Sequence, residues 1–166
     1  DGLKTGHTNE SGYGLIGSVK RNDRRVTLVI NGLNSKKKRR FESKRLFNIV
    51  FRETTLLSLF SNKKSLVEAN VWLGNKPKVN LVASKSFKKI ISPFELNKTK
   101  IKLEWMDPIS APIAKNSVLG KIHINIPGQQ TFQEDLISSE EISKMSSLIR
   151  VKSILKFLLY GDIVAD

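Results

Sequence analysis

The chain has 166 residues, of which 39% are hydrophobic, enough for a packed core and too many for a disordered chain. It contains no cysteine, which excludes disulfides, thiolate metal sites and a cysteine nucleophile. The formal charge is +14, from 29 Lys and Arg against 15 Asp and Glu. This excess has three interpretations: a lysine-rich composition, contact with an anionic membrane surface, or binding to nucleic acid.

The first 55 residues predict a strand, a hairpin and a helix. Gly2 to Thr8 reads as a short strand, followed by a turn of polar and small residues. Two further strands, Tyr13 to Lys20 and Arg25 to Asn31, are joined at Asn22-Asp23, residue types that tolerate the positive φ of a tight hairpin. Three strands in this order favour an antiparallel sheet.

Ser35 is the predicted N-cap of a helix that runs to about Thr54. Four residues at helical spacing should pack on the sheet: Ser43, Leu46, Phe47 and Val50. The helix opens with five consecutive cations, Lys36 to Arg40, which go all the way round the helix. They therefore favour a solvated surface over a localisation signal or nucleic-acid patch, which stays as the alternative.

Residues 60–140 predict a small all-β domain, because strands are short and turn signals frequent. The expected strands are Ser65 to Leu73, Lys78 to Ala83, Ser86 to Ile91, Thr99 to Trp105, Gly120 to Ile126 and Thr131 to Ile137. This spacing indicates an antiparallel sandwich or barrel. Trp72 and Trp105 are expected in its core.

Residues 141–160 predict an amphipathic helix with one very apolar arc. The residues predicted to contact a membrane surface are Leu148, Val151, Lys152, Leu155, Lys156, Leu158 and Leu159. A helix from Lys144 to Tyr160 would be about 25 Å long, shorter than the hydrocarbon core of a bilayer. We expect it to lie in the headgroup plane. The alternative is an ordinary helix that docks on its own domain.

Lys4-Thr5-Gly6 lies on the first strand and matches the Lys-Thr-Gly motif of penicillin-binding serine enzymes. An exposed edge strand can pair its backbone with an extended peptide. The Lys4 ammonium and the Thr5 hydroxyl, expected on one face, can bind a terminal carboxylate, and Gly6 leaves room for the peptide backbone. The backbone N–H of His7 is a candidate oxyanion donor.

The order of features resembles the serine-type D-alanyl-D-alanine carboxypeptidases, which are low-molecular-mass penicillin-binding proteins. The resemblance begins with Asp1 to Thr8 and Gly12-Tyr13, and continues through Val29 to Gly32 and Glu42-Ser43. In the β-rich region it is carried by Val71 to Gly74, Val79 to Ala83, Ala111 to Ile113, Val118 to Gly120 and Ile126 to Gly128. It covers nearly the whole chain and fades at the end.

The resemblance implies an α+β fold. It consists of part of a penicillin-binding, β-lactamase-like antiparallel sheet with one helix, then a small β-sandwich and a C-terminal amphipathic helix. The expected boundaries are 1–58, 59–140 and 141–166. In such enzymes a serine of a Ser-x-x-Lys motif attacks D-Ala-D-Ala peptides of peptidoglycan precursors through an acyl-enzyme, and β-lactams acylate the same serine. No metal or cofactor is implied.

Carried over by position, Lys4, Thr5 and Gly6 would bind substrate, and the His7 amide would complete the oxyanion hole. The family's Ser-x-x-Lys and Ser-x-Asn motifs have no counterpart in their expected positions. Ser61 and Lys64 have the spacing of a Ser-x-x-Lys motif, but they follow Lys-Thr-Gly in the sequence. We interpret this match as a coincidence. We therefore expect the chain to be inactive alone, as the C-terminal portion of an enzyme at the periplasmic face of the cytoplasmic membrane.

Two other functions stay open from the sequence. The chain can be a non-catalytic module that binds the inner-membrane surface through its β domain and terminal helix. A nucleic-acid binder ranks last, because the aromatic residues expected of a base-stacking platform are missing. The carboxypeptidase interpretation predicts peptidoglycan pentapeptides and β-lactams as ligands.

Overall fold

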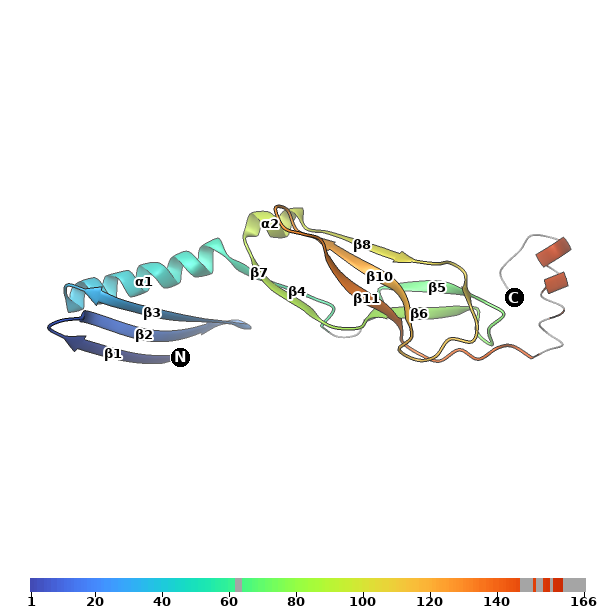
Figure 1. The fold of residues 1–166 in the computed structure, drawn as a ribbon, viewed down its shortest axis with the longest axis horizontal. Coiled ribbons are helices and arrows are strands. Elements are labelled where there is room, and N and C mark those ends of the chain that lie inside the picture. Colours follow the sequence, from blue (N-terminus) through green and yellow to red (C-terminus); the bar gives the residue numbers. More distant parts are fainter. Residues whose placement is uncertain (62–63, 147–150, 152–153, 156, 160–166) are drawn as a thin grey trace. The chain divides into compact units, whose positions relative to one another are not determined.

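A computed structural model describes residues 1–61, 64–146, 151, 154–155 and 157–159 (Figure 1). The chain forms two compact units. The first comprises residues 1–57 and 89–96, and the second comprises residues 58–88 and 97–166. The expected three-part division at residues 58 and 140 stays a prediction.

The first unit contains a three-stranded antiparallel sheet in the order β1-β2-β3. Its strands are β1 (Gly2–Thr8), β2 (Gly12–Arg21) and β3 (Arg24–Leu33). Asn22 takes the positive φ, 52°, that the turn between β2 and β3 requires. The strands and turn predicted from the sequence are thus confirmed, with β1 at one edge of the sheet.

Helix α1 (Lys36–Glu53) covers one face of this sheet (Figure 1). The Ser35 hydroxyl accepts the N–H of Lys38, which confirms the predicted N-cap. Ser43 is the buried residue of the helix. A Cβ atom on Gly17 of β2 would lie 3.3 Å from the Phe47 ring, so the Phe47 side of α1 packs against β2.

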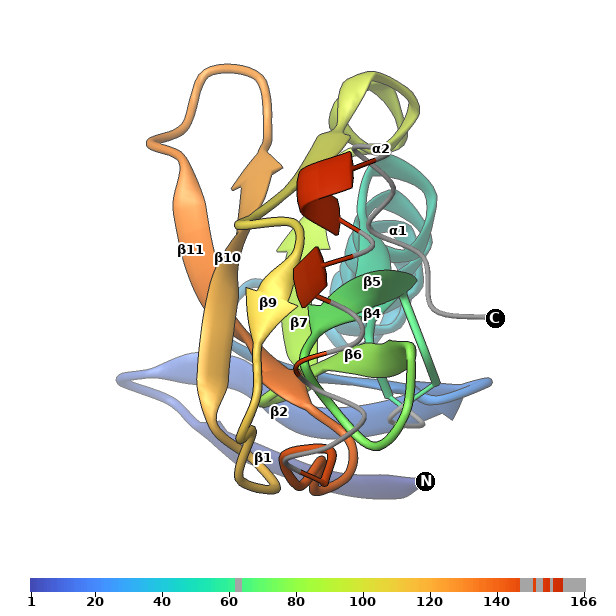
Figure 2. The ribbon, with the colours of Figure 1, turned by 90° about the vertical axis from the view of Figure 1, so that its right-hand side faces the viewer.

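The second unit is built on a six-stranded sheet in the order β8-β10-β11-β6-β5-β9. Its strands are β5 (Val67–Trp72), β6 (Lys78–Ala83), β8 (Lys100–Trp105), β9 (Ile109–Ser110), β10 (Val118–Asn125) and β11 (Phe132–Ser138). All pairs are antiparallel except β5 with β9. The sheet curls around a core (Figure 2), whose large fully buried side chains include Leu81, Ile122, Ile124, Ile126, Leu136 and Ile142.

Three short elements were not predicted from the sequence. Strand β4 (Thr55–Leu59) pairs with β7 (Phe87–Ile91) in a two-stranded sheet. Helix α2 (Pro93–Lys98) follows β7, and the two-residue strand β9 pairs with the end of β5. All three lie where the sequence lacks a long periodic pattern. The broad expectation of an α+β fold, with one long helix and a β-rich second part, is confirmed.

Candidate functional site

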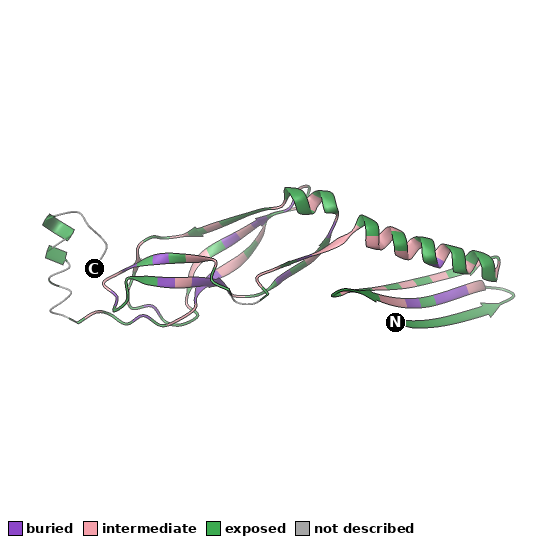
Figure 3. Cartoon of the chain, turned by 180° about the vertical axis from the view of Figure 1, so that it is seen from behind, coloured by how far each residue is buried: buried purple, intermediate pink, exposed green. Residues whose placement is uncertain are grey.

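Strand β1, which carries Lys-Thr-Gly, is an edge strand, and each of its seven residues is exposed. Figure 3 shows the contrast with β2, whose Leu15 is buried. One side of β1 pairs with β2, and its other side, here called the open edge, has no strand beside it in the described residues. The open edge therefore offers backbone groups to a ligand.

The hydrogen bonds of β2 establish which residues of β1 face the open edge. The Lys20 N–H donates to the Asp1 carboxylate over 2.9 Å, so Lys20 directs its backbone groups toward β1. Directions alternate along a strand, so Gly14 does the same, and it stands opposite Gly6. Gly6 consequently faces β2, and its neighbours Thr5 and His7 direct their N–H and C=O groups to the open edge.

Arg39 of α1 supports the same assignment. One guanidinium nitrogen, Nη1, lies 3.3 Å from the Gly6 carbonyl oxygen and 3.4 Å from that of Gly14. A single nitrogen reaches both oxygens because both carbonyls point into the space between β1 and β2. Arg39 also lies over the Tyr13 ring, 5.7 Å from its centroid, and Tyr13 packs against the His7 imidazole with centroids 3.9 Å apart. Arg39 thereby fixes the end of β1 to the helix.

The side chains of Lys4 and Thr5 lie on opposite faces of the sheet. Thr5 pairs with the buried Leu15 and Lys4 with the exposed Ile16, and consecutive side chains of a strand alternate between faces. The expectation that the ammonium and the hydroxyl share one face is therefore wrong, because it ignored this alternation. The two groups instead flank the open edge from either side. No ion pair of Lys4 occurs among the described residues.

A shallow polar groove of about 340 Å³ lies at the His7 end of β1. Its lining comes from the turn after β1, the start of β2 and the segment between β3 and α1: His7, Asn9, Glu10, Ser11, Gly12, Tyr13, Gly32, Leu33 and Asn34. The lining is polar and mostly exposed. The groove thus lies next to the exposed strand β1, at the end that carries His7.

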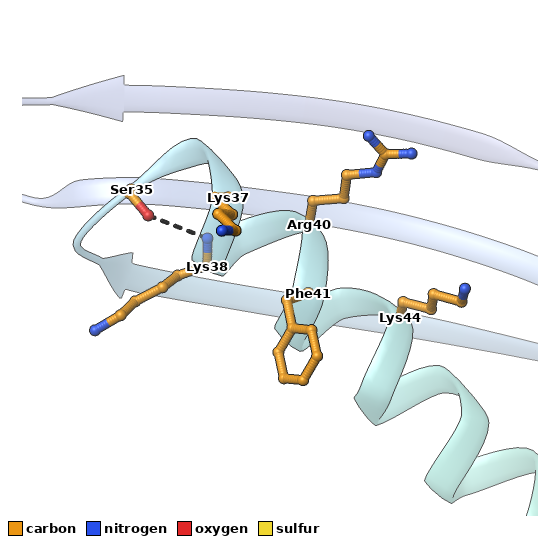
Figure 4. Close-up of a pocket in the computed structure, with 6 residues that line it drawn as sticks. All are labelled: Ser35, Lys37, Lys38, Arg40, Phe41 and Lys44. Carbon is orange, nitrogen blue, oxygen red and sulfur yellow. Dashed lines mark hydrogen bonds between the residues drawn. The ribbon is translucent and has the colours of Figure 1, made fainter.

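The structure offers no activated serine beside the open edge in the residues that it describes. Ser35 stands three residues before Lys38, but its hydroxyl accepts the backbone N–H of Lys38 as a helix cap. The Lys38 ammonium extends away from that hydroxyl (Figure 4). The Ser61 motif includes residues 62–63, which lie outside the described residues. The Ser35–Lys38 pair therefore lacks the serine–lysine arrangement that nucleophilic attack requires.

The terminal helix is described only in part. Val151, Leu155, Leu158 and Leu159 are helical and more than half exposed, whereas Leu148, Lys152 and Lys156 lie outside the described residues. The Phe157 ring meets the edge of the Trp72 ring at 5.1 Å between centroids, a contact within the second unit. One aromatic contact therefore joins the helix to its own domain, and Leu155, Leu158 and Leu159 stay accessible.

Among the described residues there is neither a candidate metal site nor a membrane-spanning helix. No group of three or more His, Asp or Glu side chains there is placed to hold a metal ion. In the same part of the chain, no helix combines the length and apolar character needed to cross a membrane. The open edge of β1 is consequently the best-defined candidate site.

Arg39 and Tyr13 were missed as site residues by the sequence analysis. From sequence alone, Arg39 is one of five consecutive cations, and Tyr13 is only part of the resemblance. The signal that distinguishes Arg39 is its spacing of four residues before Ser43, which places it near the sheet-facing side of the helix. The neighbouring cations Lys38 and Arg40 are exposed.

Comparison with known proteins identifies relatives over most of the chain. D-alanyl-D-alanine carboxypeptidase DacC of Escherichia coli is 30% identical over 145 residues, which cover 87% of this chain and 36% of the relative. DacA of Haemophilus influenzae is 30% identical over 138 residues, covering 82% and 35%. The chain thus spans just over a third of the length of these relatives.

Solved structures agree with these relatives. Penicillin-binding protein 5 from Haemophilus influenzae superimposes with a TM-score of 0.58 at 29% identity, covering 85% of this chain and 42% of that one. Penicillin-binding protein 6B from Escherichia coli, at 20% identity and a TM-score of 0.54, covers 81% and 33% and supports the fold alone. The family "Penicillin-binding protein 5, C-terminal domain" matches residues 55–144. The chain therefore belongs to the penicillin-binding protein 5 C-terminal domain family.

Proposed function

We propose that the chain is the C-terminal portion of a serine D-alanyl-D-alanine carboxypeptidase, and that the open edge of β1 forms one wall of its substrate cleft. The observation that carries this proposal is the direction of the Thr5 and His7 backbone groups, which face the open edge directly beside the Lys-Thr-Gly side chains. The relatives' names and their coverage of the chain support the same reaction.

In this proposal an extended peptide ending in D-Ala-D-Ala lies along the open edge as an added strand. The Thr5 hydroxyl and the Lys4 ammonium approach its terminal carboxylate from opposite faces of the sheet. The His7 N–H donates to the oxygen of the scissile carbonyl as that oxygen becomes negative. One such donor accelerates acyl transfer by about 10²–10³.

The nucleophile comes from a serine outside the 166 residues. It attacks the carbonyl between the two alanines, the C–N bond breaks, the terminal D-Ala leaves, and water hydrolyses the resulting ester. Loss of a serine nucleophile costs about 10⁶ in turnover in a measured protease, and one oxyanion donor is far too weak to offset that. The 166-residue chain alone is accordingly inactive.

Labelling with a fluorescent penicillin tests the proposal. The 166-residue chain should not become covalently labelled. A chimera, in which residues 1–57 replace the corresponding segment of Haemophilus influenzae penicillin-binding protein 5, should be labelled. Thr5→Val should slow labelling of the chimera at least tenfold, whereas the matched Thr8→Val variant, on the face opposite Thr5, should not. A folded chimera that stays unlabelled would contradict the role assigned to β1.

A second candidate function, a membrane-surface module at the periplasmic face of the cytoplasmic membrane, rests on the exposed Leu155, Leu158 and Leu159. A helix with such an apolar side suits the headgroup plane. The chain should co-sediment with anionic vesicles, and removal of residues 143–166 should abolish this. The opposing observation is the Phe157–Trp72 contact, which favours docking of the helix on its own domain.

A further inference from the structure

Strand β8 forms one end of the six-stranded sheet in the second unit (Figure 1). Strand β10 pairs with one side of β8, and its other side, here called the β8 edge, has no strand beside it in the described residues. The strand lies within residues 55–144, which match the family of C-terminal domains. The β8 edge therefore belongs to the C-terminal domain and not to the first unit.

Hydrogen bonds elsewhere in the sheet establish which residues direct their backbone groups to the β8 edge. The Ser84 N–H donates to the Asp135 carbonyl over 2.9 Å, so Asp135 of β11 directs its backbone groups to β6. Lys121 of β10 stands opposite Asp135 and therefore faces β8, where it meets Glu104. Glu104 consequently faces β10, and directions alternate along the strand. The residues whose N–H and C=O groups face the β8 edge are Ile101, Leu103 and Trp105.

Strand β8 carries apolar side chains on one face of the sheet and charged side chains on the other. Ile101 stands opposite the fully buried Ile124, yet 44% of Ile101 is exposed, so the core is incompletely covered at the β8 edge. Lys102 and Glu104 alternate with the apolar positions and lie on the other face. Glu104 Oε2 lies 3.1 Å from Nε2 of His123, but 63% of the Glu104 side chain stays exposed. Lys102 is exposed and belongs to no ion pair in the described residues.

The order of these side chains makes β8 complementary to a second copy of itself. In an antiparallel pair with a two-fold axis at Leu103, residues that face the edge meet each other, so Leu103 stands opposite its own copy and Ile101 opposite Trp105. Lys102 then stands opposite Glu104 of the other copy, and the same ion pair repeats across the axis. Both ion pairs occupy positions without backbone hydrogen bonds, where opposing side chains come closest. The two apolar pairs lie together on the core face.

The same charges disfavour the neighbouring registers. The smallest shift that keeps the hydrogen-bond pattern is two residues, because backbone directions alternate. A shift in one direction sets Lys102 opposite Lys102 of the other copy, and a shift in the other direction sets Glu104 opposite Glu104. Like charges directly opposite each other destabilise a strand pair. Lysines on an edge strand usually prevent pairing between copies, and Glu104 removes that repulsion in the register centred on Leu103.

We propose that two copies of the chain pair through their β8 edges, as an antiparallel dimer centred on Leu103. The two six-stranded sheets would become one continuous sheet, and the outward N–H and C=O groups of β8 would be paired across the axis. The interface is small, so this is a weak complex. The proposal is independent of the carboxypeptidase reaction, because it uses no residue of the open edge of β1.

Sedimentation equilibrium of the full chain, from micromolar to millimolar concentration, tests the dimer by charge exchange. Lys102→Glu sets like charges opposite each other at two positions, and so does Glu104→Lys, so each should raise the dissociation constant of the dimer about tenfold. The double variant Lys102→Glu with Glu104→Lys restores both ion pairs and should dimerise like the original chain. A mixture of the two single variants should form heterodimers for the same reason. A chain that is monomeric at millimolar concentration, or a double variant as weak as the single ones, would overturn the proposal.

Lys115→Glu is the matched control for net charge. Lys115 is exposed in the turn before β10 and belongs to no ion pair in the part of the chain that the structure describes. Lys115→Glu and Lys102→Glu both lower the net charge of +14 by two, which by itself reduces the repulsion between copies. Only Lys102→Glu should weaken the dimer. Equal dissociation constants for these two variants would refute the proposal, because they would show association through another surface or a response to net charge alone.

Introduced thiols report the register, because the chain contains no cysteine of its own. Residues opposite each other at a position without backbone hydrogen bonds have Cα atoms about 4.5 Å apart, a separation that a disulfide can span. Mild oxidation of a mixture of Lys102→Cys and Glu104→Cys chains should therefore give a mixed disulfide dimer. Either variant alone should give much less, because each residue is offset by two positions from its own copy. Equal cross-linking in the mixture and in the single variants would contradict the register centred on Leu103.

Discussion

Arg39 is predicted to hold the end of β1 in place, and Arg39→Gln tests this. The substitution removes two hydrogen bonds from a charged group to the Gly6 and Gly14 carbonyls, at 3.3 and 3.4 Å, and one contact with the Tyr13 ring. Bonds of this length at a partly exposed site contribute about 1 kcal/mol each, and the ring contact about 0.5 kcal/mol. Only the Gly6 bond joins α1 to β1, because Gly14 and Tyr13 belong to β2, so we expect the opening of β1 from β2 to become easier by about 1 kcal/mol.

Amide hydrogen exchange measures this opening directly. The Gly6 and Gly14 amides lie between β1 and β2, and their exchange should accelerate about fivefold, since 1.4 kcal/mol corresponds to a factor of ten. The Leu28 amide in β3 should respond much less. Arg40→Gln, an exposed neighbour without a partner in the described residues, is the control. Unchanged exchange at Gly6 in Arg39→Gln, or the same effect in Arg40→Gln, would refute the reasoning.

Three further substitutions probe the packing. Gly120→Ala would place a Cβ 2.3 Å from the Glu104 carbonyl oxygen, and we expect thermal unfolding to show a loss of about 3 kcal/mol. Ile124→Ala empties a fully buried position and should cost about 2–5 kcal/mol in urea unfolding. Arg24→Met removes the bond from Nη1 to the Thr54 carbonyl at 2.5 Å, which should cost about 2 kcal/mol, seen as faster amide exchange at the end of α1. For each substitution, a loss of stability below about 0.5 kcal/mol would contradict the packing or hydrogen bond described for that residue.

The sequence predicted the elements that have strong local signals. The hairpin at Asn22-Asp23, the Ser35 cap and the bounds of β1 follow from turn chemistry, capping and alternation, and the structure confirms them. Strands β4 and β9 and helix α2 are too short for periodicity to detect. The pairing of β4 and β9 depends on strands far along the chain, which are β7 for β4 and β5 for β9.

The candidate site was predicted in its residue types but not in its geometry. Lys4, Thr5 and His7 were identified from a three-residue motif and a resemblance. The Lys4 and Thr5 side chains lie on opposite faces of the sheet, and the His7 amide faces the open edge. This arrangement depends on the pairing of β1 with β2, which the sequence of β1 alone does not determine. The role of Arg39 depends on a contact between residues 33 positions apart, and such a contact leaves no local pattern in a run of cations.

The central claim, that the open edge of β1 binds a D-Ala-D-Ala terminus, is tested most directly by amide NMR of the chain. N-acyl-D-Ala-D-Ala at millimolar concentration should shift the Thr5 and His7 amides, which face the open edge. The Gly6 amide, which faces β2, should move much less, and the L-Ala-L-Ala peptide should produce weaker shifts. No response at Thr5 and His7, or shifts of equal size at Gly6, would contradict the account.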